Sequence, residues 1–256
     1  FYRVTFARQA RTAGFPWTGW SVDRKVNGAT ETLFGGGTAG YSPTFVNSAG
    51  VPFHATVGVD TSPAMLARAA AHAGGGLRFV LGDAGAFADG PGGWDVVFSN
   101  AALHWVEGHE ALLPRLAALL APGGQLAVQV PCNDHHPSHT AAQAVAAEAP
   151  FAAALGGWSR TSPVLPPERY AELLFRAGLT ARRVRLEVYG HELAGRDEVV
   201  EWVRGTTLTD YERRLPAALW PAFLERYPAR LAAALPDERP FLYTYRRLLL
   251  WGRRPA

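Results

Sequence analysis

Three short apolar runs of this chain each end on a polar side chain, at Asp60, Asp83 and Asn100. The runs read ATVGVD, LRFVLGD and DVVFSN, and stretches of helical pattern follow them. Short strands that alternate with helices indicate a parallel sheet. Since an open α/β sheet binds its ligand at the carboxyl ends of its strands, the three polar residues are candidates for one binding site. A carboxylate in such a place can accept hydrogen bonds from both ribose hydroxyls, which predicts a nucleoside-type ligand.

Each of these polar residues has a candidate role and a simpler alternative. We expect Asp60 to bind a ribose, although an acid at that position could instead cap the following helix. Asp83 could accept a hydrogen bond from the exocyclic amine of adenine, beside the backbone amide of Ala84, or it could be an ordinary turn aspartate. Asn100, with Ala101 after it, faces the same crevice and could hold the amino-acid end of a ligand.

Further candidate side chains follow the first and third of these strands. Thr61 or Ser62 can cap the next helix, and Thr61 belongs to the predicted cofactor site. Met65 could touch an adenine face, or it could be a buried helix methionine. His104 and Trp105 lie where a reacting group would sit, although a structural histidine and a packing tryptophan are the alternatives.

A glycine cluster, FGGGTAG, precedes the three runs and supplies the candidates Gly35, Gly37 and Gly40. Glycines let a backbone approach a ligand closely. A nucleotide-binding α/β domain normally begins with a strand, a glycine turn and a helix. The helix is missing here, because YSPTFVNSAGVPFH carries two prolines and a glycine. Residues 1–54 are therefore expected to be an atypical segment with a degenerate first strand, glycine turn and helix.

The pattern is regular from residue 55 onwards, and we expect one domain over 55–256. A helical stretch at about 196–235 interrupts its sheet pattern and predicts a cap, and we expect the stretch at about 132–165 to belong to the same cap. Outside the cap, the pattern predicts helices at 61–73, 107–121 and 166–179, and later strands at 125–131, 181–189 and 242–253.

The composition is that of a globular protein, with 48% hydrophobic and 18% charged residues. A net charge of +3, spread over helices that also carry acids, gives no ground for a nucleic-acid partner. No apolar run approaches the roughly 18 residues of a membrane-spanning helix. The single cysteine, Cys132, excludes an internal disulfide and fits a reducing compartment, so we expect a cytoplasmic protein.

Two other groups of residues could bind ligands. The segment CNDHHPSH brings a cysteine, an aspartate and three histidines together, but its spacing matches no strong zinc pattern, so we expect a polar loop and no metal site. The arginines of the cap could receive a carboxylate substrate, or they could be solvated helix faces. Arg204 is the substrate candidate among Arg196, Arg204, Arg213 and Arg214.

Four segments together resemble the class I S-adenosylmethionine-dependent methyltransferases: GVDTSPAML, GDAGAF, DVVFSNAALHW and LLAPGGQLAVQVP. The resemblance covers about residues 55–254, and the cap segments EVVEWVRGTTL and FLERYPARL are similar to those of the branch that acts on trans-aconitate. It implies a Rossmann-like α/β fold: a seven-stranded sheet, mostly parallel with an antiparallel last strand, and a helical cap inserted late in the chain. It also implies that Asp60 binds the cofactor ribose, Asp83 the adenine region and Asn100 the methionine portion. The acid that begins the family's glycine motif is absent here, where Leu33 or Phe34 stands.

The resemblance implies an enzyme that uses S-adenosylmethionine to O-methylate a carboxylate of a small polycarboxylic acid such as trans-aconitate, and we expect a monomer. An ionised carboxylate needs no general base, whereas an amine or phenol would need one, for which His104 is the first candidate. Two other classes stay open at this point. One is a non-catalytic relic or interaction module with a defective cofactor loop, and the other is a nicotinamide-dependent oxidoreductase, which also uses glycines and a strand-end acid.

Overall fold

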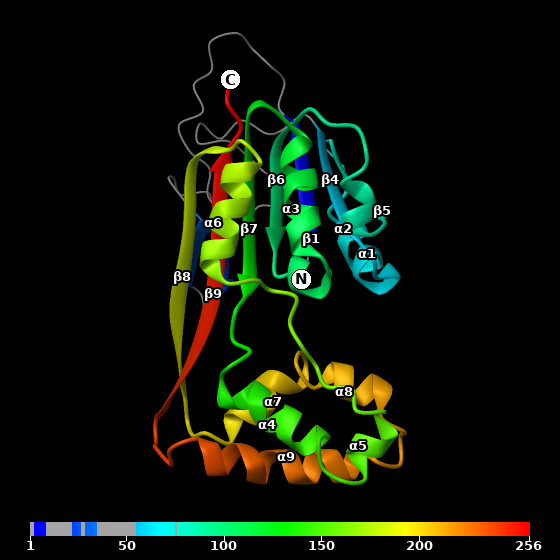
Figure 1. Ribbon diagram of the computed structural model, residues 1–256, viewed down its shortest axis with the longest axis vertical. Helices are drawn as coiled ribbons and strands as arrows, with labels where there is room; N and C mark the ends of the chain where they lie inside the picture. The colour runs from blue at the N-terminus through cyan, green and yellow to red at the C-terminus, as the bar shows by residue number, and fades with distance from the viewer. Residues whose placement is uncertain (1–2, 9–21, 27–28, 35–54, 75) are drawn as a thin grey trace. The chain divides into compact units, whose positions relative to one another are not determined.

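The computed structural model describes residues 3–8, 22–26, 29–34, 55–74 and 76–256 (Figure 1). Seven of the described strands form one sheet, in the order β5-β4-β1-β6-β7-β9-β8. These strands are β1 (Arg3–Arg8), β4 (Ala55–Asp60), β5 (Leu77–Leu81), β6 (Trp94–Asn100), β7 (Leu120–Pro131), β8 (Thr180–Leu193) and β9 (Phe241–Arg253).

The sheet is mixed, because an antiparallel strand lies in its middle. β4 and β5 pair in parallel, as do β6 and β7, whereas β1 runs antiparallel to both of its neighbours, β4 and β6. The expectation that only the last strand is antiparallel is therefore wrong at β1. Parallel neighbours need a crossover connection, usually a helix. The described residues between β1 and β4 form two strands instead, β2 (Val22–Val26) and β3 (Ala29–Phe34).

The strands β2 and β3 pair with each other in a separate two-stranded antiparallel sheet. The glycine cluster FGGGTAG begins at Phe34, which is the last residue of β3. The cluster therefore follows a strand that does not belong to the seven-stranded sheet. The candidate residues Gly35, Gly37 and Gly40 lie outside the described residues.

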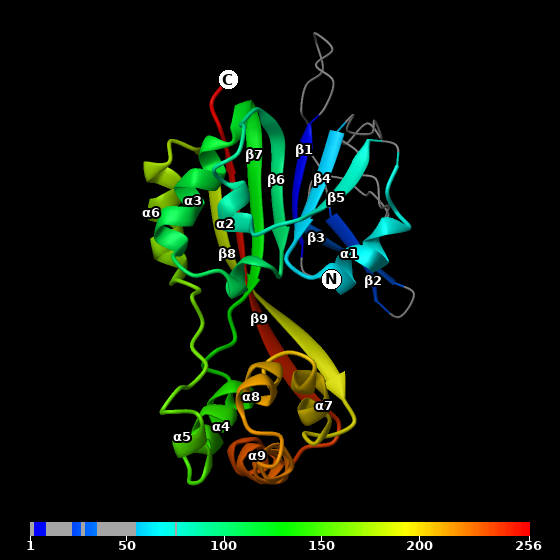
Figure 2. The same cartoon turned by 90° about the vertical axis from the view of Figure 1, so that its right-hand side faces the viewer.

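Two helices, α3 (His109–Ala118) and α6 (Pro167–Arg176), pack against each other over one face of the sheet (Figures 1 and 2). Helix α6 is amphipathic and buries three residues, Tyr170, Leu173 and Leu174, on one side. It ends before Gly178, whose φ of 72° is one that glycine adopts without a steric penalty. The helices therefore shield the apolar residues of the central strands from water on this face.

Strand β7 begins earlier than the sequence pattern predicts. The strand expected at 125–131 extends back to Leu120 and includes the Pro-Gly-Gly segment, where its register against β6 shifts. The backbone is tight at this irregularity, because a Cβ on Gly124 would come within 2.7 Å of the carbonyl oxygen of Trp94. Only glycine fits there, so the segment that reads as a turn is a bulge within the strand.

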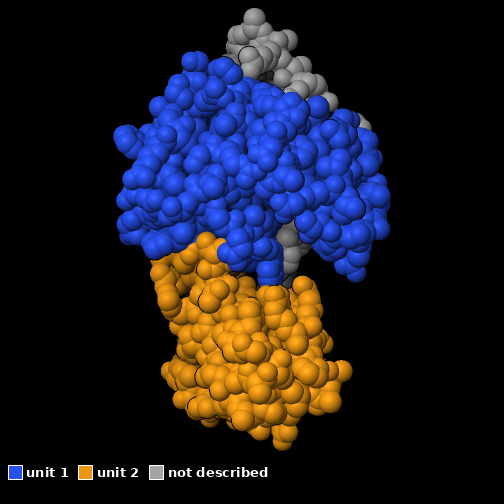
Figure 3. All heavy atoms as spheres, turned by 45° about the vertical axis from the view of Figure 1, so that its right-hand side comes forward, with its two compact units in different colours: residues 1–130, 165–185, 249–256 blue, residues 131–164, 186–248 orange. Residues whose placement is uncertain are grey.

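The chain divides into two compact units, which Figure 3 colours separately. Unit 1 comprises residues 1–130, 165–185 and 249–256, and unit 2 comprises 131–164 and 186–248. Unit 2 contains nearly all of the two stretches that the sequence assigns to a cap. Its helices are α4 (Pro137–Ala146), α5 (Phe151–Ala154), α7 (Glu198–Arg204), α8 (Thr209–Arg214) and α9 (Trp220–Ala234).

Aromatic side chains form the centre of unit 2. Five of them are completely buried: Phe151, Tyr211, Phe223, Tyr227 and Tyr243. The ring of Phe223 stacks on Tyr211 with centroids 5.2 Å apart and meets the edge of Phe151 at 5.3 Å. Such pairs add to the stabilisation that burial alone gives, so this unit has a hydrophobic core of its own. Among the described residues, no helix is long and apolar enough to cross a membrane.

Candidate functional site

The register of the sheet brings two predicted site residues to the same edge and the same face. Val4 of β1 pairs with Val59 of β4 and with Ser99 of β6, and the next residues along those strands are Asp60 and Asn100. Register partners share a face and successive residues alternate, so Asp60 and Asn100 point to the same face. One strand separates β4 from β6, which places the two residues about 10 Å apart along the sheet edge.

Asp60 closes β4 and also shapes the turn that follows. Its Oδ1 atom accepts a hydrogen bond from the backbone N–H of Ser62 at 2.8 Å. Ser62 in turn caps helix α1 (Pro63–Ala70), because its Oγ accepts from the N–H of Met65 at 3.3 Å. Thr61 is exposed and Met65 is half-buried. Of the two residues that could cap this helix, the structure therefore selects Ser62, whose own N–H uses only one of the two carboxylate oxygens of Asp60.

Asp83 lies two residues after β5 and begins the short helix α2 (Ala84–Phe87). Its Oδ1 atom accepts from the backbone N–H groups of Gly85 at 2.7 Å and Ala86 at 3.1 Å. Asp83 is thus a helix cap, a structural role that differs from the ordinary turn aspartate considered from the sequence. Its side chain is exposed, and Ala84 is buried beside it.

Asn100 ends β6, and the backbone turns sharply after it. The next residue, Ala101, has a φ of 49°, a left-handed conformation that costs a non-glycine residue about 1–2 kcal/mol. The N–H of Ala101 donates to the carbonyl of Gln129 on β7 at 2.9 Å, which holds the turn against the neighbouring strand. The Oδ1 atom of Asn100 is buried and has no hydrogen-bond partner among the described residues. This strained turn with an unsatisfied acceptor has the character of a ligand site.

His104 and Trp105 lie in the single 3₁₀ turn η1 (Leu103–Trp105) that follows. Their rings are 4.7 Å apart between centroids. His104 is only 6% exposed, whereas Trp105 is 40% exposed. In this arrangement Trp105 is accessible to a ligand and the ring of His104 is packed inside.

A buried hydrogen-bond chain fixes the same turn from behind. Nε2 of His109 donates to the carbonyl of Leu103 at 2.9 Å, so Nδ1 accepts a hydrogen bond from the hydroxyl of Tyr170. The Tyr170 hydroxyl accepts in turn from the N–H of Leu165 at 3.2 Å. Burial lowers the pKa of His109, and its hydrogen bond to Leu103 opposes that shift. The sequence pattern does not reveal this chain, because Leu103 and Tyr170, its most distant members, are 67 residues apart.

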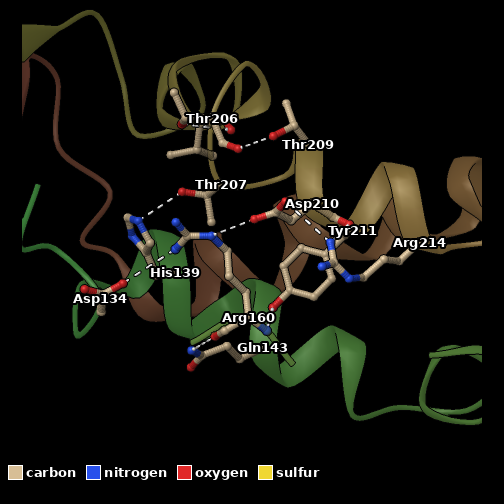
Figure 4. Close-up of polar contacts among 11 residues, drawn as sticks. Asp134, His139, Gln143, Arg160, Thr206, Thr207, Thr209, Asp210, Tyr211 and Arg214 are labelled. Atoms are coloured by element: carbon tan, nitrogen blue, oxygen red, sulfur yellow. Dashed lines mark hydrogen bonds and ion pairs between the residues drawn. The ribbon is translucent and has the colours of Figure 1, made fainter. Parts of the chain in front are cut away.

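In unit 2, hydrogen bonds and ion pairs between polar side chains connect segments that are far apart in the sequence (Figure 4). Arg160 pairs with Asp134 at 3.5 Å and with Asp210 at 3.2 Å. Nε2 of His139 contacts the hydroxyl of Thr207 at 3.0 Å. Because Arg160 already faces two carboxylates, it is better suited to joining these segments than to binding an anionic substrate.

The predicted substrate residue Arg204 lies on α7, where it is exposed and pairs with Glu201 at 2.9 Å. Arg214 pairs with Asp210 at 3.5 Å, and its guanidinium lies 4.1 Å from the ring centre of Trp158. Exposed pairs of this kind are weak enough for a stronger anion to compete with them.

The segment CNDHHPSH is a loop over residues 132–136, and its last three residues, 137–139, begin α4. Nδ1 of His136 accepts from the N–H of Ser138 at 3.1 Å and caps the helix, and Ser138 is fully buried. The expectation of a loop is therefore wrong only at 137–139, because Pro137 suits the first turn of a helix, which brings the following residues inside unit 2. Within the described part of the chain, no three His, Cys, Asp or Glu residues are placed to hold a metal ion.

Sequence comparison identifies the family. The family of methyltransferase domains matches residues 33–128, beginning just before the glycine cluster. The trans-aconitate 2-methyltransferase of Deinococcus radiodurans is 41% identical over 210 residues, which are 80% of this chain and 79% of the relative. The enzyme of the same name from Methylobacterium nodulans is 43% identical over 207 residues, 79% of each chain.

This chain belongs to the S-adenosylmethionine-dependent methyltransferases. As a methyltransferase it is an enzyme with S-adenosylmethionine as its cofactor, and the alternative of a nicotinamide-dependent oxidoreductase is set aside. A solved structure, Haemonchus contortus phosphoethanolamine N-methyltransferase 2 in complex with S-adenosyl-L-methionine, is 16% identical with a TM-score of 0.43, and the match covers 78% of this methyltransferase and 43% of that chain.

Proposed function

We propose that this methyltransferase O-methylates a carboxylate of a small polycarboxylic acid, with trans-aconitate as the first candidate acceptor. The observation that carries the proposal is the 41–43% identity to two trans-aconitate 2-methyltransferases over about four fifths of the chain. Local geometry supports a binding site, since Asp60 and Asn100 share a face of the sheet and Oδ1 of Asn100 has no partner among the described residues.

The described residues suit the cofactor by their chemistry. Asp60 offers a carboxylate oxygen that the Ser62 contact does not use, and a ribose hydroxyl can donate to it. Asn100 offers the buried Oδ1 atom to the methionine portion, next to Ala101. Asp83, Ala84, Thr61 and Met65 are assigned to the adenosine side, and the glycines Gly35, Gly37 and Gly40 complete the proposed site.

The chemistry asks for alignment and exclusion of water more than for acid–base catalysis. S-adenosylmethionine supplies, when bound, a methyl group on a sulfonium sulfur that is already activated for displacement. An ionised carboxylate needs no base, which agrees with the burial of His104. We keep Trp105 of unit 1 as a candidate apolar contact of the acceptor. Arg204 of unit 2 is, taken by itself, a candidate cation for a carboxylate.

Two measurements on the purified chain test this proposal. Calorimetric titration with S-adenosylhomocysteine tests the cofactor site, and we expect binding in the micromolar range. Mass spectrometry after incubation with S-adenosylmethionine and trans-aconitate tests the acceptor, and we expect a monomethyl ester. The trimethyl ester of aconitate is the matched control, because it lacks a carboxylate to react. Binding of S-adenosylhomocysteine without ester formation would mean that the cofactor assignment is right and that the methyltransferase acts on another acceptor.

A further inference from the structure

Gln129 on β7 is the feature that the cofactor site does not explain. It is 1% exposed, and neither its amide nitrogen nor its amide oxygen has a hydrogen-bond partner among the described residues. A primary amide has two donors and an acceptor oxygen with two lone pairs. Buried polar groups in proteins are nearly always paired, so two unpaired atoms on one side chain point to a missing partner.

The neighbour of Gln129 in the sheet is Asn100. The two are register partners in the parallel pairing of β6 with β7, so their side chains leave the sheet on the same face. The hydrogen bond from the Ala101 N–H to the Gln129 carbonyl fixes their relative position from the backbone side. Oδ1 of Asn100 is also buried without a partner among the described residues, so unpaired amide atoms of two side chains lie at the carboxyl ends of adjacent strands.

The strand order indicates which part of the reaction these amides serve. Asp60 ends β4, Asn100 ends β6 after one intervening strand, and Gln129 lies on β7, one strand further along. With strands about 4.8 Å apart, Gln129 is about 14 Å from the ribose residue along the same edge. A cofactor that extends from Asp60 to Asn100 leaves the position beside Gln129 for the group that receives the methyl.

We propose that Gln129 is a specificity-determining residue whose side-chain amide donates hydrogen bonds to a carboxylate of the acceptor. This inference rests on the proposed function. An uncharged amide suits the role, because it orients the carboxylate through N–H donors but forms weaker bonds than a guanidinium. Burial strengthens those bonds, since water does not compete for the donors.

The chain offers a matched pair of variants. Gln129→Met replaces the unpaired amide by an apolar side chain of similar length. Gln125→Met makes the same change four residues earlier on β7, on the same face, where Oε1 of Gln125 accepts from Nε1 of Trp251 at 2.9 Å. Gln125 is also buried, at 6% exposure. The two variants thus differ in whether the lost amide has a hydrogen-bond partner among the residues that the structure describes.

We expect the two variants to change Tm in opposite directions, and only Gln129→Met to change KM for trans-aconitate. Gln129→Met should raise the Tm of the ligand-free chain by about 2–4 °C, because an unsatisfied buried amide is removed. It should also raise KM for trans-aconitate at least tenfold, while the Kd of S-adenosylhomocysteine stays within twofold of the wild type. Gln125→Met should lower Tm and leave KM for trans-aconitate unchanged.

The inference is overturned if Gln129→Met lowers Tm as Gln125→Met does and leaves KM for trans-aconitate unchanged, since Gln129 would then be structural. A rise in the Kd of S-adenosylhomocysteine equal to the rise in KM would also overturn it, by assigning Gln129 to the cofactor. If the proposed function is wrong, the wild-type protein will not methylate trans-aconitate, and the proposed role of Gln129 is then also lost. Failure of the inference alone shows only in the variant.

Discussion

The hydroxyl of Tyr170 on α6 donates a hydrogen bond to Nδ1 of His109 on α3, and this pair supports the turn after β6 from behind. His109 is 2% exposed, Tyr170 is fully buried, and Nε2 of His109 holds the carbonyl of Leu103 at 2.9 Å. Two helices that cover the sheet therefore also fix the backbone that carries Asn100 and Ala101. The imidazole of His109 therefore connects the packing of α3 and α6 to the proposed cofactor site.

Tyr170→Phe removes this support without changing the shape of the core. We expect the variant to lose about 1–3 kcal/mol in the free energy of unfolding, because Nδ1 of His109 loses its donor in a buried place. We also expect weaker binding of S-adenosylhomocysteine, by about three- to tenfold, because the turn after β6 is less well positioned. Urea denaturation and calorimetry measure the two effects.

The control for this variant is Tyr227→Phe, which removes a buried hydroxyl that donates to the carbonyl of Ser138 at 2.8 Å in unit 2. It should lose comparable stability and bind S-adenosylhomocysteine as the wild type does. Equal affinity losses in both variants would show that the effect of Tyr170 is only a loss of stability.

Asp60→Asn tests the ribose assignment with little disturbance of the turn. An asparagine oxygen can still accept from the Ser62 N–H, which Asp60 binds at 2.8 Å, while its NH₂ group cannot accept from a ribose hydroxyl. We expect affinity for S-adenosylhomocysteine to fall by about 1–3 kcal/mol, measured by calorimetry. Asp89→Asn, an exposed acid paired with Arg115 at 2.6 Å, should have no effect. Wild-type affinity in Asp60→Asn would mean that the ribose lies elsewhere.

Two variants of Asp83 separate its cap from its proposed contact with adenine. Asp83→Ala removes the acceptor for the N–H groups of Gly85 and Ala86, and should cost about 0.5–2 kcal/mol of stability. Asp83→Asn keeps a capping oxygen, so stability should be close to that of the wild type. If the other carboxylate oxygen accepts from the adenine amine, both variants should bind S-adenosylhomocysteine more weakly. Weak binding by the alanine variant alone would leave Asp83 as a cap only.

Acid should destabilise the protein through His139. Burial first, with Arg160 and His136 adding to it, lowers the pKa of His139 from 6.5 to about 3. Between these values the unfolded chain binds a proton that the folded chain does not, so stability falls as pH falls from about 6.5 to about 3. The contribution is about 1.4 kcal/mol per pH unit at most, because one proton is involved.

Denaturant unfolding across this pH range checks the prediction, with His139→Gln as the comparison. Burial also lowers the pKa of His109 and His136, so those residues keep part of the pH dependence in the variant. The slope of stability against pH should nevertheless be smaller in His139→Gln. Identical slopes in the two proteins would contradict a neutral, buried His139.

The strands, and the polar residues at their ends, could be predicted because they depend on local pattern. β4 and β6 are apolar runs buried along nearly their whole length, and Asp60 and Asn100 are their last residues, as the sequence suggests. The helix α6 and its end before Gly178 follow in the same way from amphipathic spacing and a glycine stop.

The features that local pattern does not predict depend on pairing between distant segments. The antiparallel direction of β1 is set by its neighbours β4 and β6, which are about 50 and 90 residues away along the chain. The partners of His109 come from a helix about 60 residues later. Gln129 reads as one of two glutamines in a largely apolar strand, and only its position beside Asn100 on the neighbouring strand gives it a candidate role.

The most direct test of the central claim is methyl transfer to a free carboxylate. The wild-type chain is incubated with S-adenosylmethionine carrying an isotopically labelled methyl group and with trans-aconitate, and the products are separated and weighed by mass spectrometry. We predict a labelled monomethyl ester of aconitate, formed together with an equal amount of S-adenosylhomocysteine, and no product from the trimethyl ester. If the protein binds S-adenosylhomocysteine but all of the aconitate stays unlabelled, that result would contradict the assignment of the acceptor.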